Sequence, residues 1–275
     1  METDFGSKLF WIGFWLYFLS FSLFAIYLAA QRRFFGWLAA TAMFLGFMPH
    51  TAALIDRWIL MRDLPMNTMY EYANLMCWMV VAVFGVFLVR YRRPLIGVVI
   101  SPCVVMIMVA ISILPNETSA LVVPHLRGWW LNIHVALTAL GEAAFDVGYV
   151  LGLAYLVCAK RWKVALARDD VTSTTRLAFL QDMSFRSIAL GYPFFTVGAL
   201  FAGSMWALQA SGSFWAWNPK EVSALLIWLL YTAYLYARMV RGWRPQTLAW
   251  ISVAGFTLIL LSFLSNLFLG GHPRS

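Results

Sequence analysis

The side chains of this sequence best suited to hold a transition metal are its four histidines. Neutral imidazole is a good ligand for iron, and two imidazoles from different helices can bind one iron atom from opposite sides. His50 and His134 lie inside apolar runs, His125 lies in the loop before His134, and His272 is three residues from the C-terminus. A lone histidine near a membrane surface is more often an interfacial side chain than a ligand, so the metal hypothesis depends on pairs of histidines facing one side.

A tryptophan-rich stretch, SMWALQASGSFWAWNPKEVSALLIW at 204–228, lies between two apolar runs. Its tryptophans are Trp206, Trp215, Trp217 and Trp228. The pattern predicts a loop over 206–218 followed by a helix. Asn218 is a good N-cap, Pro219 suits the first helical position, and Glu221 lies where its carboxylate can reach back to the cap. Taken alone, this pattern fits an interfacial tryptophan belt followed by a capped membrane helix.

Histidines and tryptophans gathered on one side of a membrane would also suit a haem. Flat indole rings can pack against the plane of a porphyrin, and two histidines can hold its iron. The two propionates of a porphyrin need cationic partners. The candidate partners are Arg57, Arg62, Arg127 and Lys220.

The composition predicts an integral membrane protein. Hydrophobic residues make up 62% of the 275 residues and charged residues only 12%, whereas soluble domains average about 25% charged residues. The apolar runs reach the roughly 20 residues that a helix needs to cross a bilayer. We therefore predict an all-α, polytopic fold, with residues 1–275 as one membrane domain. The eight expected helices span about 9–30, 34–55, 70–89, 94–114, 131–158, 187–208, 219–237 and 246–268.

The distribution of positive charge predicts the orientation of these helices. Most of the 20 lysines and arginines fall in alternate connections, the richest of which is 160–186. Because positive residues favour the cytoplasmic side, both termini are expected outside, together with the loop 206–218 and all four histidines. The net charge of +8 is therefore a topology signal, and nucleic acid is not expected as a partner.

Two acidic residues, Glu142 and Asp146, lie deep in the fifth apolar run. They are four residues apart, and Glu142 is two helical turns from His134, so the three can share one helix face. Carboxylates inside a membrane helix are costly and usually functional. A polar path or a partner contact is one interpretation, and an inter-helix contact with arginine or backbone is the other.

The tryptophan-rich stretch resembles a motif of the cytochrome c biogenesis proteins of the CcsA kind, which belong with CcmC and CcmF to a haem-handling family. The positions that match are Gly212, Phe214, Trp215, Trp217, Pro219, Lys220, Glu221, Ala224 and Leu225. The run LPMNTMYEYANLMCW resembles a second family segment through Pro65, Asn67, Tyr70 and Glu71. WWLNIHVALTALG and FLSNLFLGGHPRS resemble the segments that carry the external histidines of the family, which correspond to His134 and His272.

This resemblance implies a function and a set of residues. Haem b is expected at the outer surface with His134 and His272 as axial iron ligands. The other implied cofactor-binding positions are His50, Trp206, Phe214, Trp215, Trp217, Asn218, Pro219, Lys220 and Glu221. The protein would present haem to the C-x-x-C-H motif of an apocytochrome c. It would act as the haem-handling part of a cytochrome c synthase in the bacterial inner membrane, facing the periplasm, with a membrane partner of the CcsB/ResB kind.

The chain departs from the family pattern at four positions, which keep two alternative functions open. Ser211 and Ser223 replace tryptophans, Asn218 replaces an aspartate, and Tyr236 stands where a transmembrane histidine is often found. One alternative is a haem exporter of the CcmC kind that passes haem to a chaperone. The other is a haem-binding assembly factor or sensor without ligation activity. For His50, structural packing and haem contact are both possible.

Overall fold

The computed structural model describes residues 4–61, 68–114, 129–161 and 171–269, and every regular element in these ranges is a helix. Eight of the described helical segments are long and apolar enough to cross a membrane. The predicted all-α, polytopic membrane fold is therefore confirmed. The chain divides into two compact units, Met1–Pro124 and His125–Ser275.

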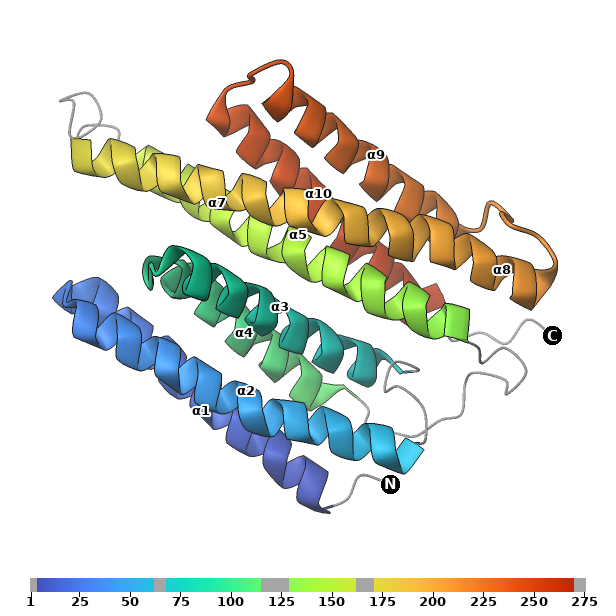
Figure 1. The fold of residues 1–275 in the computed structure, drawn as a ribbon, viewed down its shortest axis with the longest axis horizontal. Helices are drawn as coiled ribbons and strands as arrows, with labels where there is room; N and C mark the ends of the chain where they lie inside the picture. The colour runs from blue at the N-terminus through green and yellow to red at the C-terminus, as the bar shows by residue number, and fades with distance from the viewer. Residues whose placement is uncertain (1–3, 62–67, 115–128, 162–170, 270–275) are drawn as a thin grey trace. The chain divides into compact units, whose positions relative to one another are not determined.

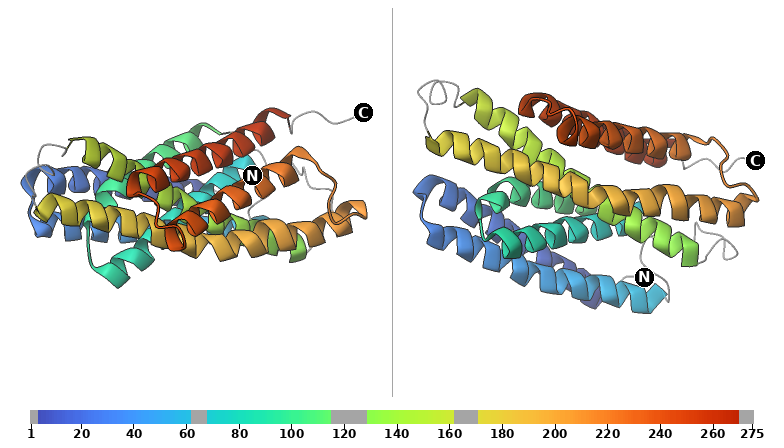
Figure 2. Two further views of the ribbon diagram at one scale, coloured as in Figure 1. Left: turned by 90° about the horizontal axis from the view of Figure 1, so that it is seen from above. Right: turned by 45° about the horizontal axis from the view of Figure 1, so that its top comes forward.

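The described residues of unit 1 form four helices. They are α1 (Asp4–Ala30), α2 (Arg33–Met61), α3 (Met69–Tyr91) and α4 (Leu95–Ile113). α1 and α2 form an antiparallel hairpin and lie side by side along their lengths (Figures 1 and 2). The hairpin is close because Gly46 faces the ring of Tyr17, where a Cβ would lie 2.9 Å from the nearest ring carbon.

Both ends of α3 are determined by local sequence. Thr68 accepts a hydrogen bond from the Glu71 backbone N–H, and the Glu71 carboxylate accepts one from the Thr68 N–H, which makes a complete capping box. At the other end Arg92 adopts the left-handed conformation, with φ at 50°, and its N–H donates to the Leu88 carbonyl. α3 therefore begins and ends at residues that are held by local hydrogen bonds.

Unit 2 is built around one long rod. The rod consists of α7 (Val171–Phe195), the π-helical segment η2 (Thr196–Ala202) and α8 (Gly203–Ser211), which follow one another without a break in Figures 1 and 2. α5 (Trp129–Arg161) packs along this rod, and the unit is completed by α9 (Pro219–Met239) and α10 (Pro245–Leu269).

The rod begins earlier than the sequence predicts. The sixth helix was expected over 187–208, but α7 starts at Val171, inside the expected hydrophilic connection 160–186. The helix can continue through polar residues because their side chains find partners on α5. Ser184 Oγ donates to the Gly148 carbonyl and Ser187 Oγ donates to the Ala144 carbonyl, both at 2.7 Å. α2 and α5 also run a few residues beyond their predicted ends.

α5 meets the rod along a seam of glycines spaced seven residues apart. Gly141 and Gly148 belong to α5, and Gly191 and Gly198 belong to the rod. A Cβ at Gly141 would lie 2.7 Å from the backbone nitrogen of Phe195, so only glycine permits this approach. Small residues of this kind allow membrane helices to pack backbone against backbone. The seam fixes the rotation of α5 about its axis and therefore the direction of its other side chains.

α9 and α10 attach to this pair through aromatic contacts. Tyr231 of α9 stacks on Phe145 with ring centroids 3.8 Å apart, and Tyr149 stacks on Phe256 of α10 at 4.0 Å. A Cβ at Gly152 would lie 2.5 Å from the Ser252 Oγ, so α10 runs antiparallel to α5. Trp228 Nε1 donates to Thr196 Oγ1 at 3.0 Å, which anchors α9 at the start of the π-helical segment.

Candidate functional site

His134 lies on the glycine seam, seven residues before Gly141, and is half-buried in unit 2. Its Nδ1 is 2.9 Å from the carbonyl oxygen of Gly198. A carbonyl can only accept, so Nδ1 carries the hydrogen and donates it. The lone pair of the neutral ring is then on Nε2. Histidines that bind metals are usually held in this way, with the second nitrogen donating to a carbonyl or carboxylate.

The π-helical segment shapes the carbonyl that His134 contacts. The Gly203 N–H donates to the Gly198 carbonyl five residues earlier, the hydrogen bond typical of a π-helix. Pro193, which lacks an N–H, precedes the segment within the same rod. A Cβ at Gly203 would lie 3.1 Å from His134 Nδ1, and one at Gly198 would lie 2.5 Å from the Thr138 nitrogen. The two glycines therefore leave room for the imidazole against the rod, at a kind of helix irregularity that is frequent in functional sites.

Trp206 provides a flat wall beside the histidine. Its ring lies parallel to that of His134, with an interplanar angle of 4° and centroids 6.3 Å apart. Lys220, at the start of α9, is close enough to His134 for the two to interact electrostatically. We call the end of unit 2 that holds His134, residues 212–218 and the start of α9 the His134 end.

The start of α9 confirms most of the local expectations. Asn218 is the N-cap, its Oδ1 accepts from the Glu221 N–H at 2.9 Å, and Pro219 is the first helical residue. The Glu221 carboxylate reaches further back than expected and accepts from the Ala216 N–H at 2.7 Å. The loop is thereby tied to the helix that follows it. Trp217, between these bonds, has a φ of 54°, a left-handed conformation that is strained for a bulky residue.

The aromatic residues of this loop are largely exposed. Phe214 is 56% and Trp217 is 71% exposed, and Trp215 packs edge-on against Trp217 with centroids 5.9 Å apart. The Trp215 Nε1 is buried and has no hydrogen-bond partner among the described residues. A strained, tethered loop that presents indoles is a surface suited to a flat, apolar ligand.

Three of the four residues that depart from the family pattern make local hydrogen bonds, and the fourth lies on the surface of unit 2. Ser211 ends α8 and donates to the Ala207 carbonyl at 2.9 Å. Ser223 donates to the Pro219 carbonyl, and Ser262 of α10 donates to the Ser223 Oγ at 3.2 Å. Asn218 is the N-cap described above. Tyr236 is 54% exposed on the surface of unit 2, so its phenol does not point into the core of this unit.

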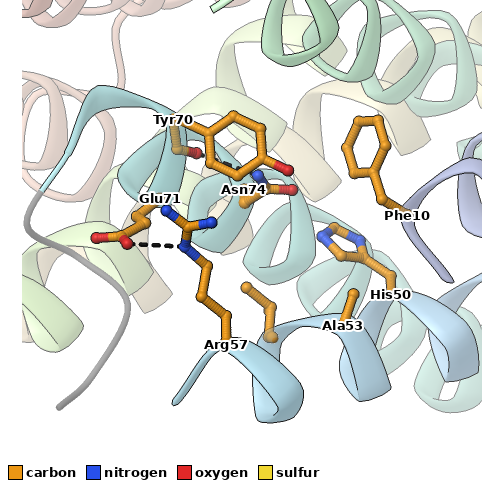
Figure 3. A pocket seen from close by; sticks show the side chains of 8 residues that line it. Phe10, His50, Ala53, Arg57, Tyr70, Glu71 and Asn74 are labelled. Atoms are coloured by element: carbon orange, nitrogen blue, oxygen red, sulfur yellow. Dashed lines mark hydrogen bonds and ion pairs between the residues drawn. The ribbon is translucent and has the colours of Figure 1, made fainter. Parts of the chain in front are cut away.

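His50 lies in unit 1, fully buried, in different surroundings. The Tyr17 hydroxyl is 3.1 Å from its Nδ1, and its Nε2 has no hydrogen-bond partner among the described residues. Phe10, Asn74 and the ring of Tyr70 lie around it in Figure 3. The cavity that they line has a volume of about 20 Å³, which holds one water molecule. Within unit 1 this cavity has no room for a porphyrin.

Arg57, a candidate partner for a propionate, is committed to the interior of unit 1. Its Nε donates to the Glu71 Oε1 at 2.8 Å, and its guanidinium lies 5.1 Å from the centre of the Tyr70 ring (Figure 3). The Tyr70–Glu71 pair of the second matching segment therefore has a structural role, since Glu71 joins this ion pair to the capping box of α3.

Several predicted residues lie outside the described residues, namely His125, His272, Arg62 and Arg127. Conversely, no sequence motif pointed to Gly198 and Gly203, which form the His134 contact. Only Gly198 had a signal in the spacing, because Gly191 and Gly198 repeat at the same interval as Gly141 and Gly148.

The fold and the site define a polytopic helical membrane protein in which one end of unit 2 holds a hydrogen-bonded histidine, His134, and an exposed tryptophan, Trp217. A model of the family described as cytochrome c assembly protein matches residues 66–272. The cytochrome c biogenesis protein CcsA of Microcystis aeruginosa is 32% identical over 267 residues, which cover 80% of this chain and 81% of that protein. The protein of the same name from Guillardia theta is 30% identical, covering 80% and 79%. The chain thus belongs to the cytochrome c assembly protein family and is of the CcsA type.

A solved structure shares the fold. The cytochrome c heme lyase CcmF superposes with a TM-score of 0.69 at 18% identity, over 94% of this chain. The match covers 46% of the CcmF chain, so this protein spans about half the length of that one.

Proposed function

We propose that the protein binds haem as its cargo at the His134 end and presents it for covalent attachment to an apocytochrome c. The observation that carries the proposal is the hydrogen bond from His134 Nδ1 to the Gly198 carbonyl. This bond leaves Nε2 free to bind iron and makes the ring a better donor to it. The relatives named for cytochrome c biogenesis support the choice of haem as cargo.

The second axial ligand in this proposal is His272. α5 and α10 are antiparallel, with Tyr149 beside Phe256. Leu269, the last residue of α10, lies thirteen residues after Phe256, and Ala136, two residues from His134, lies thirteen residues before Tyr149. His272 follows Leu269 by three residues in the sequence. Because both helices rise about 1.5 Å per residue, this register carries α10 toward the level of His134. The Ser262–Ser223 contact supports it, since it holds the last turns of α10 against the start of α9.

The tryptophan loop would cover the porphyrin. The exposed indole of Trp217 and the partly exposed indole of Trp215 supply apolar area, and Trp206 lies parallel to the His134 ring. Lys220 is the cation nearest to His134 on α9 that can meet a propionate. Phe214, Asn218, Pro219 and Glu221 then act by shaping the loop, through the cap and the Glu221–Ala216 hydrogen bond. Arg57 is not part of this set.

The attachment reaction adds a cysteine thiol across each vinyl group. Sulfur bonds to the inner vinyl carbon and the thiol hydrogen ends on the outer one, so no electron is gained or lost overall. The chain needs only to hold the haem with its vinyl edge accessible and its iron ligated. Haem b, which has free vinyl groups, fits this reaction. A CcsB/ResB-type partner that positions the apocytochrome, and an outward-facing His134 end in a bacterial inner membrane, complete the proposal.

The test is the spectrum of the purified, full-length protein loaded with haem. His134→Gly should lose the low-spin spectrum of a bis-histidine haem, and added imidazole should restore it by filling the space. His272→Gly should behave in the same way. His125→Ala is the matched control, since it removes a histidine just before α5 and should leave the spectrum unchanged. A wild-type spectrum in His134→Gly without imidazole would overturn the proposal.

An assay in cells distinguishes the proposed function from the two alternatives, a haem exporter and a haem-binding assembly factor or sensor. Covalent cytochrome c should form in a strain that lacks its own maturation genes when this protein and a CcsB/ResB-type partner are both present. Haem release to a soluble chaperone without any covalent product would indicate an exporter of the CcmC kind. Haem binding with neither product nor release would indicate an assembly factor or sensor. His50→Ala should retain the haem spectrum if His50 only packs against Tyr17.

A further inference from the structure

A line of polar side chains runs along α5 from His134 into the membrane interior. It consists of His134, Thr138, Glu142 and Asp146, each four residues after the one before. Residues at this spacing lie on one ridge of a helix surface. α5 is otherwise strongly apolar and is one of the helices long enough to cross the membrane. Two carboxyl groups in such a segment are energetically costly, and carboxyl groups retained there usually have a function.

Three polar atoms along this line are buried without a hydrogen-bond partner among the described residues. They are Thr138 Oγ1, Asp146 Oδ1 and the hydroxyl of Tyr231. Asp146 is 6% exposed and Tyr231 is fully buried. Tyr231 belongs to α9, but its stacking on Phe145 brings it beside Asp146, with which it interacts electrostatically. Buried polar atoms are almost always paired, so atoms left unpaired by protein groups indicate a small polar ligand.

The spacing of the line fits water molecules. Successive members are separated by about 6 Å along the helix, which is too far for a direct hydrogen bond. One water between each pair would make two hydrogen bonds of about 2.8 Å and span that gap. Thr138 can accept one hydrogen bond and donate another, as a member of a relay must.

We propose that Thr138, Glu142, Asp146 and Tyr231 form a hydrated proton path that connects the membrane interior of unit 2 to the His134 end. Asp146 is its inner terminus and holds a proton there. Two carboxyl groups one helical turn apart cannot both be ionised in an apolar environment, so Glu142 and Asp146 share at least one proton.

The surroundings of Asp146 favour a proton over a metal cation. From α5 it faces Glu142, and from α9 it faces Tyr231, with Tyr234 next along the same helix. The rod contributes Ser184 and Ser187, whose hydroxyls already donate to α5 carbonyls. In the described part of the chain, no group of three histidine, cysteine or carboxylate residues is arranged to hold a metal ion.

We expect the path to couple proton uptake to the reduction of haem. This part of the inference rests on the proposed function. When ferric haem at His134 accepts one electron from a one-electron reductant such as dithionite, a proton taken up along the path balances the added negative charge near an apolar interior. The electron ends on iron and the proton ends on the Glu142–Asp146 pair. The reductant is oxidised by one electron, and no other species is consumed. The affinity of the haem for the electron then depends on pH.

The first test needs no haem. Infrared spectra of the full-length protein should show the carbonyl stretch of a protonated carboxylic acid that shifts when the solvent is D₂O. Asp146→Asn, which keeps the shape, should remove that band. Asp182→Asn removes the exposed carboxylate paired with Arg186 and should leave it intact. Tyr231→Phe, which keeps the stack on Phe145, should shift the band and serves if Asp146→Asn does not fold.

A band that survives in Asp146→Asn, or that is missing from the wild type, would overturn the proton site. A band that disappears when sodium or potassium is added would show a cation site and would also overturn it.

The second test uses the haem-loaded protein reduced with dithionite. The midpoint potential of the wild type should fall as the pH rises, and this dependence should be lost in Asp146→Asn. A bis-histidine spectrum with a potential that does not change with pH would refute the coupling and leave the proposed function standing. Absence of haem binding would refute the proposed function, while the infrared result would still decide on the proton site.

Discussion

The two units contain the same pair of local features in opposite surroundings. Each has a histidine within a helix and, close to it, a helix that begins with a side-chain N-cap followed three residues later by a glutamate. In unit 1 the histidine is His50 and the glutamate is Glu71, and both are buried. In unit 2 they are His134 and Glu221, and both are partly exposed.

The difference lies in what each glutamate contacts. Glu71 uses one oxygen for the cap and the other for Arg57, so an ion pair lines the cavity beside His50. Glu221 uses its carboxylate to hold the backbone of Ala216 and with it a loop of exposed indoles. The same capped start thus stabilises a core in one unit and presents a binding surface in the other. Variants at matched positions should therefore affect stability in unit 1 and haem binding in unit 2.

The largest expected effect is the loss of the buried ion pair in unit 1. Glu71→Ala leaves the Arg57 guanidinium buried without its carboxylate and opens the capping box, and it should destabilise the protein by about 3–5 kcal/mol. Thermal unfolding in detergent measures the effect. The matched control is Asp182→Ala, which breaks the exposed pair with Arg186 and should cost less than about 0.5 kcal/mol. Equal effects of the two variants would refute the structural role of Glu71.

A smaller effect is expected from Gly198→Ala at the His134 contact. The new Cβ would meet the backbone of α5 at Thr138, so the rod must shift, at a cost of about 1–3 kcal/mol. The shift moves the carbonyl that fixes the His134 ring, and the haem spectrum should broaden or become high-spin. Gly13→Ala is the control in unit 1, where the Cβ would make an ordinary 3.4 Å contact with the Gly46 carbonyl. It should leave both stability and spectrum nearly unchanged.

The two N-caps allow a direct test of the comparison. Asn218→Ala and Thr68→Ala each remove a side chain that accepts the N–H of the following glutamate, and each should cost about 1 kcal/mol. Only Asn218→Ala should weaken haem binding, as measured by titration of the purified protein, because only that cap holds the tryptophan loop. An equal loss of haem affinity in Thr68→Ala would mean that the capped starts of α3 and α9 do not differ in function.

The sequence predicted the features that depend on nearby residues. Apolar length predicted the membrane helices, and the order Asn218, Pro219, Glu221 predicted the start of α9. Tertiary contacts decided the rest. α7 begins early because Ser184 and Ser187 bond to α5, and Arg57 pairs with Glu71 instead of facing a ligand. The π-helical turn at Gly198 lies where the rod packs against α5. The hydrophobic pattern of one helix carries no information about such a contact.

The smallest stability effect should come from two of the left-handed residues, Arg92 in unit 1 and Trp217 in unit 2. Trp217 and Arg92 have φ values of 54° and 50°, a conformation that costs a residue with a side chain about 1–2 kcal/mol and glycine very little. Trp217→Gly and Arg92→Gly should both raise stability slightly, because the strain is removed. The gain is limited to about 1 kcal/mol because glycine also gives the unfolded chain more conformational freedom. Arg92 merely ends α3, so Arg92→Gly should support cytochrome c formation at the wild-type level. Trp217→Gly removes the most exposed indole of the loop and should reduce that formation strongly. If Trp217→Gly were stabilised and fully active, the strain at this residue would have no role in presenting haem. The contrast between the two units would then rest on His134 and its contact with Gly198 alone.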